Sequence, residues 1–487
     1  MLGRAGFSAA VIVAALLASS SASADEPAPA PAPPPPAAPA DNEDWRQRNR
    51  VHPSDDGQEH RADPQNVRPV ETEPSTVATD VALAVPRIIL APPRVVLETA
   101  YLPIRGLLYL MGRYQIPERI VEFLYNDDRT AAIIPSISFI GGQGFTAGVH
   151  MFHEGWGRHK ERIDFSAKFG GRFVQAYELE MSAPNVAGTP FGIEVTTRFE
   201  IQPHLRFWGY GPQEAQEFEG APPQGPRDAH VETRFRQQRG MVRARMGWSF
   251  TDEINLGVIG VLNRRDFGPK ETEDDPEPSI ERVYDTSQIP GFNFGYTLVE
   301  PLLDFRIDSR FPAGTTSEGI YFNAFGGGAP PQNGFRFIHY GAEIAGFINL
   351  FNEDRILVLH AAHESVLGSD DEIPFADMPR LGGPTRLRGF DLHRFRDNHT
   401  AVVTVQYEWP IHEFVSGVGF FELGSVGEDY EELVQPDNYR PSGGGGLIFR
   451  DRHTKFFTVQ MAYGDSFQVF LTSDPLVAFD KRGGEEL

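Results

Sequence analysis

Residues 193–201 read IEVTTRFEI, and this stretch decides the fold class. Apolar and polar side chains alternate along it, so an extended chain here has one apolar face and one polar face. The same period of two recurs in 162–169 (RIDFSAKF), 242–250 (VRARMGWSF) and 401–409 (AVVTVQYEW). Helical patterns of ~10–15 residues do not intervene, which disfavours a parallel α/β sheet. The pattern predicts an all-β, antiparallel fold.

Three features favour a transmembrane barrel over a soluble β-sandwich. The alternating segments run longer than the ~5–6 residues usual for sandwich strands. Long polar loops alternate with tight turns, as in barrels that keep short turns at one end. Aromatic residues stand at strand ends, where a barrel carries its interfacial girdles. They are Phe207-Trp208, Trp248-Phe250 and Tyr407-Trp409. We predict a transmembrane antiparallel β-barrel of about 16 strands over 129–479, with a soluble periplasmic β-protein as an alternative.

The N-terminus has the layout of an export signal. One basic residue, Arg4, precedes an apolar run over 7–18, and Ala22-Ser23-Ala24 supplies the small residues that a signal peptidase requires. Residues 1–24 are therefore predicted to be a cleaved signal peptide. With export through the inner membrane and a barrel fold, the expected location is the bacterial outer membrane. No stretch past residue 24 offers the ~20 mostly apolar residues of a spanning helix.

The segments that flank the predicted barrel differ from it in composition. Residues 25–79 are rich in Pro and Ala and then acidic, which predicts a disordered linker. Residues 80–128 carry short amphipathic helical patterns, which either pack under the barrel mouth or lie on a membrane face. A polar tail, 480–487, ends the sequence.

Composition and motif content exclude several classes of site. The chain contains no Cys, so disulfides, lipoprotein attachment and thiolate metal sites are ruled out. A net charge of −23 offers no basic surface for nucleic acid. The His residues at 150, 153, 159, 360 and 363 lack carboxylates at a metal-ligand spacing, and the acidic run 271–277 lacks the spaced Gly of a calcium loop. Since a phosphate loop and a Gly-x-Ser-x-Gly elbow are also missing, we predict no metal, no cofactor and no enzymatic activity.

Two short motifs in the C-terminal third bear on the interior of the predicted barrel. Leu387-Arg388-Gly389-Phe390 lies in a long loop, and Phe420-Phe421-Glu422-Leu423-Gly424 lies in a later strand. Phe420, Glu422 and Gly424 share one strand face. Because a carboxylate facing lipid is costly, that face must line the lumen. A partly dehydrated Glu422 needs a cation, and the planar fork of an arginine suits a carboxylate.

These two motifs resemble the (V/L)RG(F/Y) and FxDxG motifs of the BamA/TamA superfamily, also called the bacterial surface antigen family. The resemblance implies that the long loop folds back into the barrel. Arg388, with Gly389 and Phe390, would then lock this loop onto Glu422 of the wall. This chain carries Glu422 where the family has Asp, which is one methylene shorter.

Two further segments resemble elements of the same family, namely its FxGxG strand-to-loop element and its DxR…FPxxG hairpin. The matching positions are Gly209 and Gly211 in the first, and Asp304, Arg306, Pro312 and Gly314 in the second. The chain also departs from the family. Only residues 80–128 lie between the linker and the barrel, which is too short for a POTRA domain, so the resemblance is to members that lack POTRA domains.

The resemblance implies a function without bond chemistry, namely assistance in the insertion or translocation of other proteins or lipids at the outer membrane. The implied partners are outer-membrane lipid and unfolded outer-membrane or exported proteins. Either residues 80–128 or a separate periplasmic accessory protein would replace the POTRA domains. The alternative function is a passive channel or a structural barrel without assembly activity.

Overall fold

A computed structural model describes the chain from residue 123 to 472, apart from short gaps. The gaps are 129, 141–143, 156–159, 172–173, 272–275, 313–315, 351–354, 413 and 451–454. The predicted signal peptide, linker and polar tail, and most of the segment 80–128, lie outside the described residues. Within the described part, no helix has the length and apolar character needed to cross a membrane.

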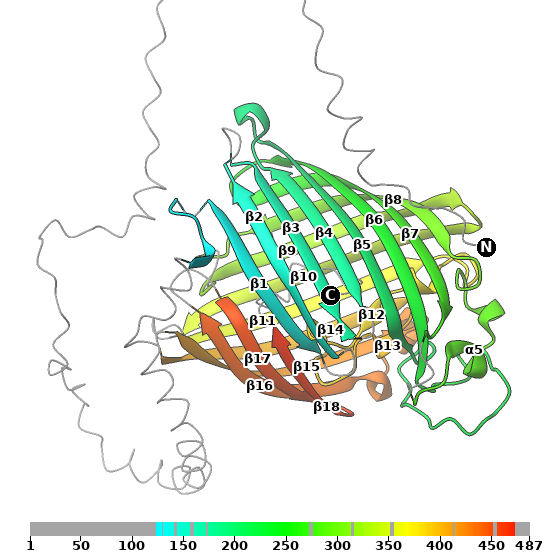
Figure 1. The fold of residues 1–487 in the computed structure, drawn as a ribbon. Coiled ribbons are helices and arrows are strands. Elements are labelled where there is room, and N and C mark those ends of the chain that lie inside the picture. The colour runs from blue at the N-terminus through cyan, green and yellow to red at the C-terminus, as the bar shows by residue number, and fades with distance from the viewer. Residues whose placement is uncertain are drawn as a thin grey trace, which may run out of the picture. The chain divides into compact units, whose positions relative to one another are not determined.

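Sixteen antiparallel strands form a closed barrel, which confirms the predicted fold (Figure 1). The strands are β1 (Ala131–Ile140), β2 (Gly144–Glu154), β3 (Arg162–Gly170), β4 (Gln175–Ala183), β5 (Phe191–Phe207), β6 (Thr233–Ser249), β7 (Ile254–Pro269), β8 (Tyr296–Asp308), β9 (Gly319–Gln332), β10 (Phe335–Leu350), β11 (Arg355–Leu367), β14 (His399–His412), β15 (Val415–Gly427), β16 (Arg440–Arg450), β17 (Lys455–Tyr463) and β18 (Phe467–Thr472). Each strand pairs with its neighbours in sequence, and β1 closes the barrel on β18.

Short elements lie in the connections at one end of the barrel, which we call the loop end. They include α5 (Ile280–Val283), α6 (Tyr430–Leu433) and a two-stranded sheet of β12 (Arg380–Leu381) and β13 (Phe395–Arg396). The longest connections, 208–232, 270–295 and 368–398, all belong to this end. We call the opposite end, with its mostly shorter connections, the turn end. The last of the three long connections is called the inserted loop below.

The outward face of the barrel is apolar, as the period of two requires. Large apolar side chains stand exposed on strands around the wall, including Ile133, Phe145, Phe169, Met181, Phe199, Val242, Met246, Leu256, Leu303, Ile344, Leu359, Val403 and Phe421. Water-soluble monomers rarely expose apolar area on this scale, because it promotes association. Hydrocarbon is the solvent that suits such a wall, while the closed sheet satisfies every strand's backbone hydrogen bonds. The soluble alternative is thereby disfavoured.

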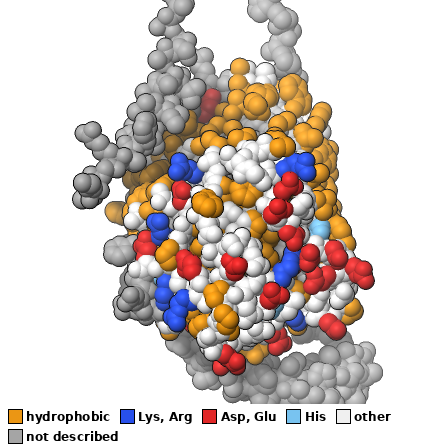
Figure 2. Space-filling model, turned by 90° about the vertical axis from the view of Figure 1, so that its right-hand side faces the viewer, with side chains coloured by type: hydrophobic (Ala, Val, Ile, Leu, Met, Phe, Trp, Pro, Cys, Tyr) orange, Lys and Arg blue, Asp and Glu red, His pale blue; other side chains and the backbone are white. Residues whose placement is uncertain are grey.

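An apolar core lies at the loop end of the lumen. Side chains from the adjacent strands β5 to β11 meet there with side chains from the loops, including Phe207, Phe235, Tyr284, Phe292, Phe337 and Phe375. The ring centroids of Phe267 and Phe375 are 4.8 Å apart, and those of Phe207 and Tyr284 are 5.0 Å apart. Figure 2, which looks onto the side of the molecule where α5 lies, shows interspersed acidic and basic side chains on the outer surface of this region.

The barrel closes between β1 and β18. In the described residues these two strands pair from Ser138–Thr472 to Ile140–Phe470, and β18 is described up to Thr472. On its other side β18 pairs with β17, from Tyr463–Phe467 to Thr458–Thr472. We call the closure between β1 and β18 the seam.

Candidate functional site: a loop docked on the barrel wall

The inserted loop enters the lumen because its own sequence folds it into a compact unit. β12 and β13 pair through Arg380–Arg396 and Leu381–Phe395, and all four residues are buried. Gly382 follows β12 with φ +108°, and a Cβ there would lie 2.2 Å from the Asp391 carbonyl oxygen. Only glycine fits this position, since it tolerates both the left-handed backbone and the close approach. The turn presents residues 386–390 to the wall.

Arg388 and Glu422 meet in the lumen. The Arg388 Nε donates to Glu422 Oε1 at 3.0 Å, and the Arg388 backbone N–H donates to Glu422 Oε2 at 2.5 Å. Both residues are buried, with 4% and 1% of their surface exposed. The guanidinium also lies 3.4 Å from the centre of the Phe420 ring. The extra methylene of Glu422, compared with the family's Asp, therefore does not prevent the contact.

Neighbouring strands complete the surroundings of this pair. The Arg388 Nη1 donates to the side-chain oxygens of Gln406 at 3.0 Å and Gln460 at 3.2 Å. The Gly389 N–H donates to Ser442 Oγ at 2.7 Å. One turn of the loop thus bonds to β14, β15, β16 and β17. The backbone N–H, the Nε and the Nη1 of Arg388 thus each have an acceptor in the lumen, as a buried charge requires.

Close packing fixes the backbone of the loop at this point. A Cβ on Gly389 would lie 2.5 Å from backbone atoms of Tyr463 and Gly464, so the loop backbone touches the β17–β18 turn directly. Gly424 lies under Leu387, and a Cβ there would be 3.0 Å from the Leu387 methyls. Phe390 packs edge-on against Phe395, with ring centroids 5.0 Å apart. The predicted residues of the loop and of the wall motif are therefore brought together at one place.

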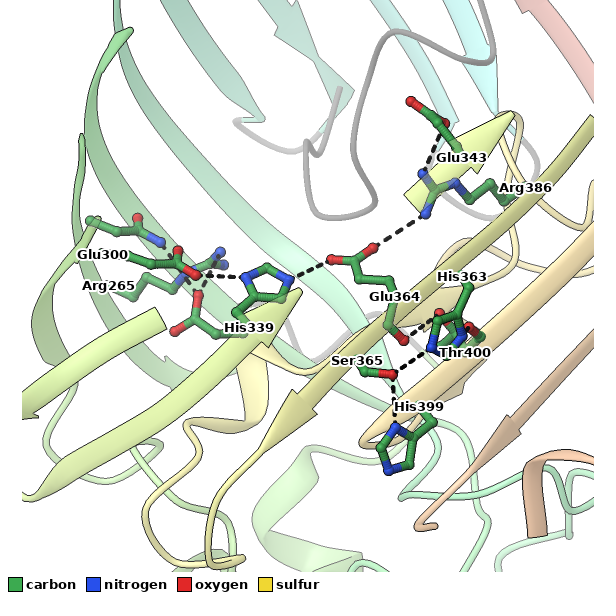
Figure 3. Close-up of polar contacts among 12 residues, drawn as sticks. Arg265, Glu300, His339, Glu343, His363, Glu364, Ser365, Arg386, His399 and Thr400 are labelled. Carbon is green, nitrogen blue, oxygen red and sulfur yellow. Dashed lines mark hydrogen bonds and ion pairs between the residues drawn. The ribbon is translucent and has the colours of Figure 1, made fainter. Parts of the chain in front are cut away.

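A second arginine of the loop, which the sequence analysis does not single out, reaches the other side of the lumen (Figure 3). Arg386 donates to Glu364 Oε2 on β11 at 3.2 Å and to Glu343 Oε2 on β10 at 3.5 Å. The other oxygen of Glu364, Oε1, lies 2.9 Å from His339 Nε2 on β10, and His339 Nδ1 lies 2.6 Å from Glu300 Oε1 on β8. We call Arg386 and Arg388, with their carboxylate partners, the loop lock. It ties the loop to strands from β10 to β17.

The remaining family-motif residues lie elsewhere in the barrel. Gly211 (φ +106°) donates its N–H to the Arg396 carbonyl at 2.9 Å, so the FxGxG segment supports the inserted loop from the side. Gly209 has φ +83°, and a Cβ there would lie 2.4 Å from two carbonyl oxygens of the 208–232 connection. Asp304 is fully buried nearer the turn end, where Arg245 Nε lies 2.8 Å and Arg306 Nε 3.0 Å from its Oδ2.

The turn that follows these residues is only partly described. Pro312 lies in the connection between β8 and β9. Gly314 falls in the gap 313–315, outside the described residues. Asp304, Arg306 and Pro312 take no part in the loop lock, so the two pairs of motifs form separate sites.

One carboxylate between β13 and β14 has perturbed acidity. Asp397 is fully buried, and its burial raises the pKa of the carboxyl to about 6. Arg227 opposes this shift by donating two hydrogen bonds, at 3.1 and 3.3 Å. Through this ion pair the 208–232 connection holds the end of the inserted loop. No group of three or more potential metal ligands occurs in the part of the chain that the structure describes.

Comparison with known proteins adds a fold likeness. No family model and no curated protein sequence matches this chain. Among solved structures, a BamA from Haemophilus ducreyi lacking POTRA domains 1–3 has 12% identity and a TM-score of 0.49, over 71% of this chain and 70% of that one. CdiB from Escherichia coli has 11% identity and a TM-score of 0.48, over 70% and 62%. CdiB from Acinetobacter baumannii has 10% identity and a TM-score of 0.44, over 70% and 58%.

The chain is similar to BamA-like barrels. At these identities and TM-scores the likeness extends to the fold alone, and the fold itself is established by the chain's own closed pairing of sixteen strands. The contacts of Arg388 with Glu422 are likewise observed in this chain itself. What the barrel does is therefore a separate question from what it resembles.

Proposed function

We propose that this chain is an outer-membrane barrel that assists the insertion or translocation of proteins or lipids through its β1–β18 seam. The observation that carries the proposal is the docking of the inserted loop on the wall beside the seam. The loop bonds to strands from β10 to β17, and β17 is the strand that pairs with β18. A wall that is held together up to the strand next to β18 would open at the closure between β1 and β18.

The filled loop end argues against the rival proposal of a passive channel. A diffusion pore needs a continuous aqueous path. At the loop end the aromatic core lies against β5 to β11, and the inserted loop bonds to strands from β10 to β17, so the two together occupy the lumen there. Ion pairs such as Arg227–Asp397 hold the loops around it. A route through the seam does not require this core to move. Unfolded outer-membrane or exported chains, and lipid, are the proposed clients, with a periplasmic accessory protein as the proposed partner in their delivery.

A reversible lock on the seam tests this proposal, and the absence of native Cys makes it simple to build. Phe139 and Leu471 are paired across the seam, so Phe139→Cys with Leu471→Cys should form a disulfide between β1 and β18. The matched control is Ile137→Cys with Ala147→Cys, which joins β1 to β2. Each variant replaces the native chain in cells, and the outer membrane is then analysed for its other barrels and its lipids.

We expect the seam-locked variant to lower the level of at least one client in the outer membrane, as deletion does, and reductant to restore it. The β1–β2 control should match the native chain. If deletion itself leaves every outer-membrane protein and lipid unchanged, the assembly proposal is wrong. If deletion has an effect but the seam lock does not, the clients do not pass through the seam.

A further inference from the structure

A polar cluster stands on the outward face of the barrel near the loop end, where the surrounding wall is apolar. Along β11, Glu364 and Val366 point into the lumen, the first to Arg386 and the second into the apolar core, so His363 and Ser365 point outward. His399 of β14 and Tyr340 of β10 are the register partners of Ser365. This cluster belongs neither to the loop lock nor to the seam.

The geometry of the cluster matches that of a nucleophile, a base and an orienting group. Ser365 Oγ lies 2.9 Å from His363 Nε2, and His363 Nδ1 lies 2.8 Å from the Thr400 carbonyl oxygen (Figure 3). A carbonyl oxygen only accepts hydrogen bonds, so Nδ1 carries the proton of the neutral ring and Nε2 presents a lone pair. That lone pair is placed to take the Ser365 proton.

Two further groups surround the serine oxygen. His399 Nδ1 lies 2.8 Å from Ser365 Oγ, and the Tyr430 hydroxyl of α6 lies 3.3 Å from it. Since Ser365 has one proton, and that proton serves His363, the serine oxygen accepts from His399. The Tyr430 ring lies over His399 with centroids 4.4 Å apart. The Tyr430 hydroxyl also lies 3.1 Å from His363 Nε2, so Tyr430 covers both the serine and the histidine.

We propose that Ser365, His363 and the Thr400 carbonyl form a hydrolytic site for long-chain acyl esters at the loop-end interface of the membrane. The residues flanking His363 across the sheet are Ala342 and Ala401, whose small side chains leave space beside the ring. Beyond them the wall carries exposed Ile344, Leu359 and Val403, an apolar surface on which an acyl chain can lie. The ester carbonyl of such a lipid would then stand at the level of Ser365.

The reaction follows the pattern of serine ester hydrolysis and uses only water as co-reactant. Ser365 Oγ bonds to the ester carbonyl carbon while its proton passes to His363 Nε2. The carbon–oxygen bond to the alcohol then breaks, and the alcohol leaves with the proton from His363. Water attacks the acyl-serine, gives its proton to the same nitrogen, and releases the fatty acid as the proton returns to Ser365.

Access to the serine requires α6 to move. Ser365 is fully buried in this structure, whereas Tyr430, which lies over the cluster, is 46% exposed. The helix has a single turn, and its bonds to the wall run through the Tyr430 hydroxyl and through the Leu433 carbonyl, which accepts from Ser425 Oγ at 2.8 Å. Tyr430 is thus a removable cover. His363 and Ser365 are not predicted as a site from sequence, because two polar residues two positions apart are ordinary in a strand.

The test uses the full chain in detergent micelles with two probes, a biotinylated fluorophosphonate and p-nitrophenyl palmitate. We expect the fluorophosphonate to label Ser365 and Ser365→Ala to lose both labelling and hydrolysis, by about 10³-fold or more. His363→Ala should lower labelling by a comparable factor. Tyr430→Ala should label several-fold faster than the native chain, because it removes the cover.

Ser425→Ala is the matched control, since it loosens the same helix without touching the nucleophile, and it should keep labelling at Ser365. A purely structural cluster would show no such contrast between Ser365→Ala and Ser425→Ala. The proposal is overturned if neither the native chain nor Tyr430→Ala is labelled at Ser365, or if Ser365→Ala hydrolyses the ester as fast as the native chain. Neither result bears on the seam.

Discussion

Replacing Arg388 by Ala gives the sharpest test of the loop lock. The substitution removes the Nε hydrogen bond to Glu422, two bonds to glutamine side chains and the contact with the Phe420 ring. Glu422 keeps the backbone N–H of residue 388 and stays within 3.4 Å of the hydroxyls of Thr404 and Ser442. Breaking a buried ion pair costs about 3–5 kcal/mol. Because these donors remain, we expect the lower end, about 3 kcal/mol.

A loss of this size corresponds to about a hundredfold change in the equilibrium between docked and undocked loop. Two assays test this. The first is urea unfolding of the barrel in micelles, monitored by heat-modifiable gel mobility. The second is single-channel conductance in planar bilayers. Arg388→Ala should unfold at lower urea and conduct more. Arg388→Ala combined with Glu422→Gln should recover part of the loss, because no buried carboxylate is left unpaired. Native behaviour of Arg388→Ala in both assays would refute the lock.

Three further outcomes are expected. Gly389→Ala should destabilise the barrel by about 2 kcal/mol or more, because the new Cβ would lie 2.5 Å from the backbone of the β17–β18 turn. Gly346→Ala is the control, since a Cβ there has no atom within 4 Å, and its urea titration should match that of the native chain. Asp397 has a folded pKa of about 6, above its ordinary 3.8, so its contribution to stability is complete below pH 4 and is lost as pH rises through 6. Asp397→Asn should therefore flatten that part of the stability–pH curve, and an unchanged slope would contradict the assignment. Arg386→Ala should cost about 3–5 kcal/mol, because Glu343 and Glu364 lose their guanidinium partner in the lumen. Thermal unfolding that matches the native chain would argue against this bridge.

The fold and part of the site were predictable from local pattern. The period of two in stretches such as 193–201 sets the strands, because a barrel wall separates lipid from lumen residue by residue. Arg388 and Glu422 were predictable as a pair from the resemblance of their two motifs to a known family, and the need of a lumenal carboxylate for a cation agrees with it. Arg386 was not predictable, since an arginine in a polar loop is ordinary, and its partners are distant in sequence.

The closed loop end was also beyond the reach of sequence patterns. Its core combines residues such as Phe207, Tyr284 and Phe375, which lie in different strands and loops. Aromatic residues scattered among polar loops carry no period, so only the packed barrel reveals that they converge. The polar cluster around Ser365 was hidden for a related reason. Its members come from three adjacent strands and one loop, and the strand register alone brings them together.

The docked loop has a consequence for the order in which the barrel matures. The inserted loop precedes β14 in the chain, yet Arg388 and Gly389 bind side chains on β15, β16 and β17. These partners do not stand in register until the last hairpins have paired, so the loop can settle only on a nearly finished wall. The docked loop therefore distinguishes a mature barrel from one that still lacks its final strands.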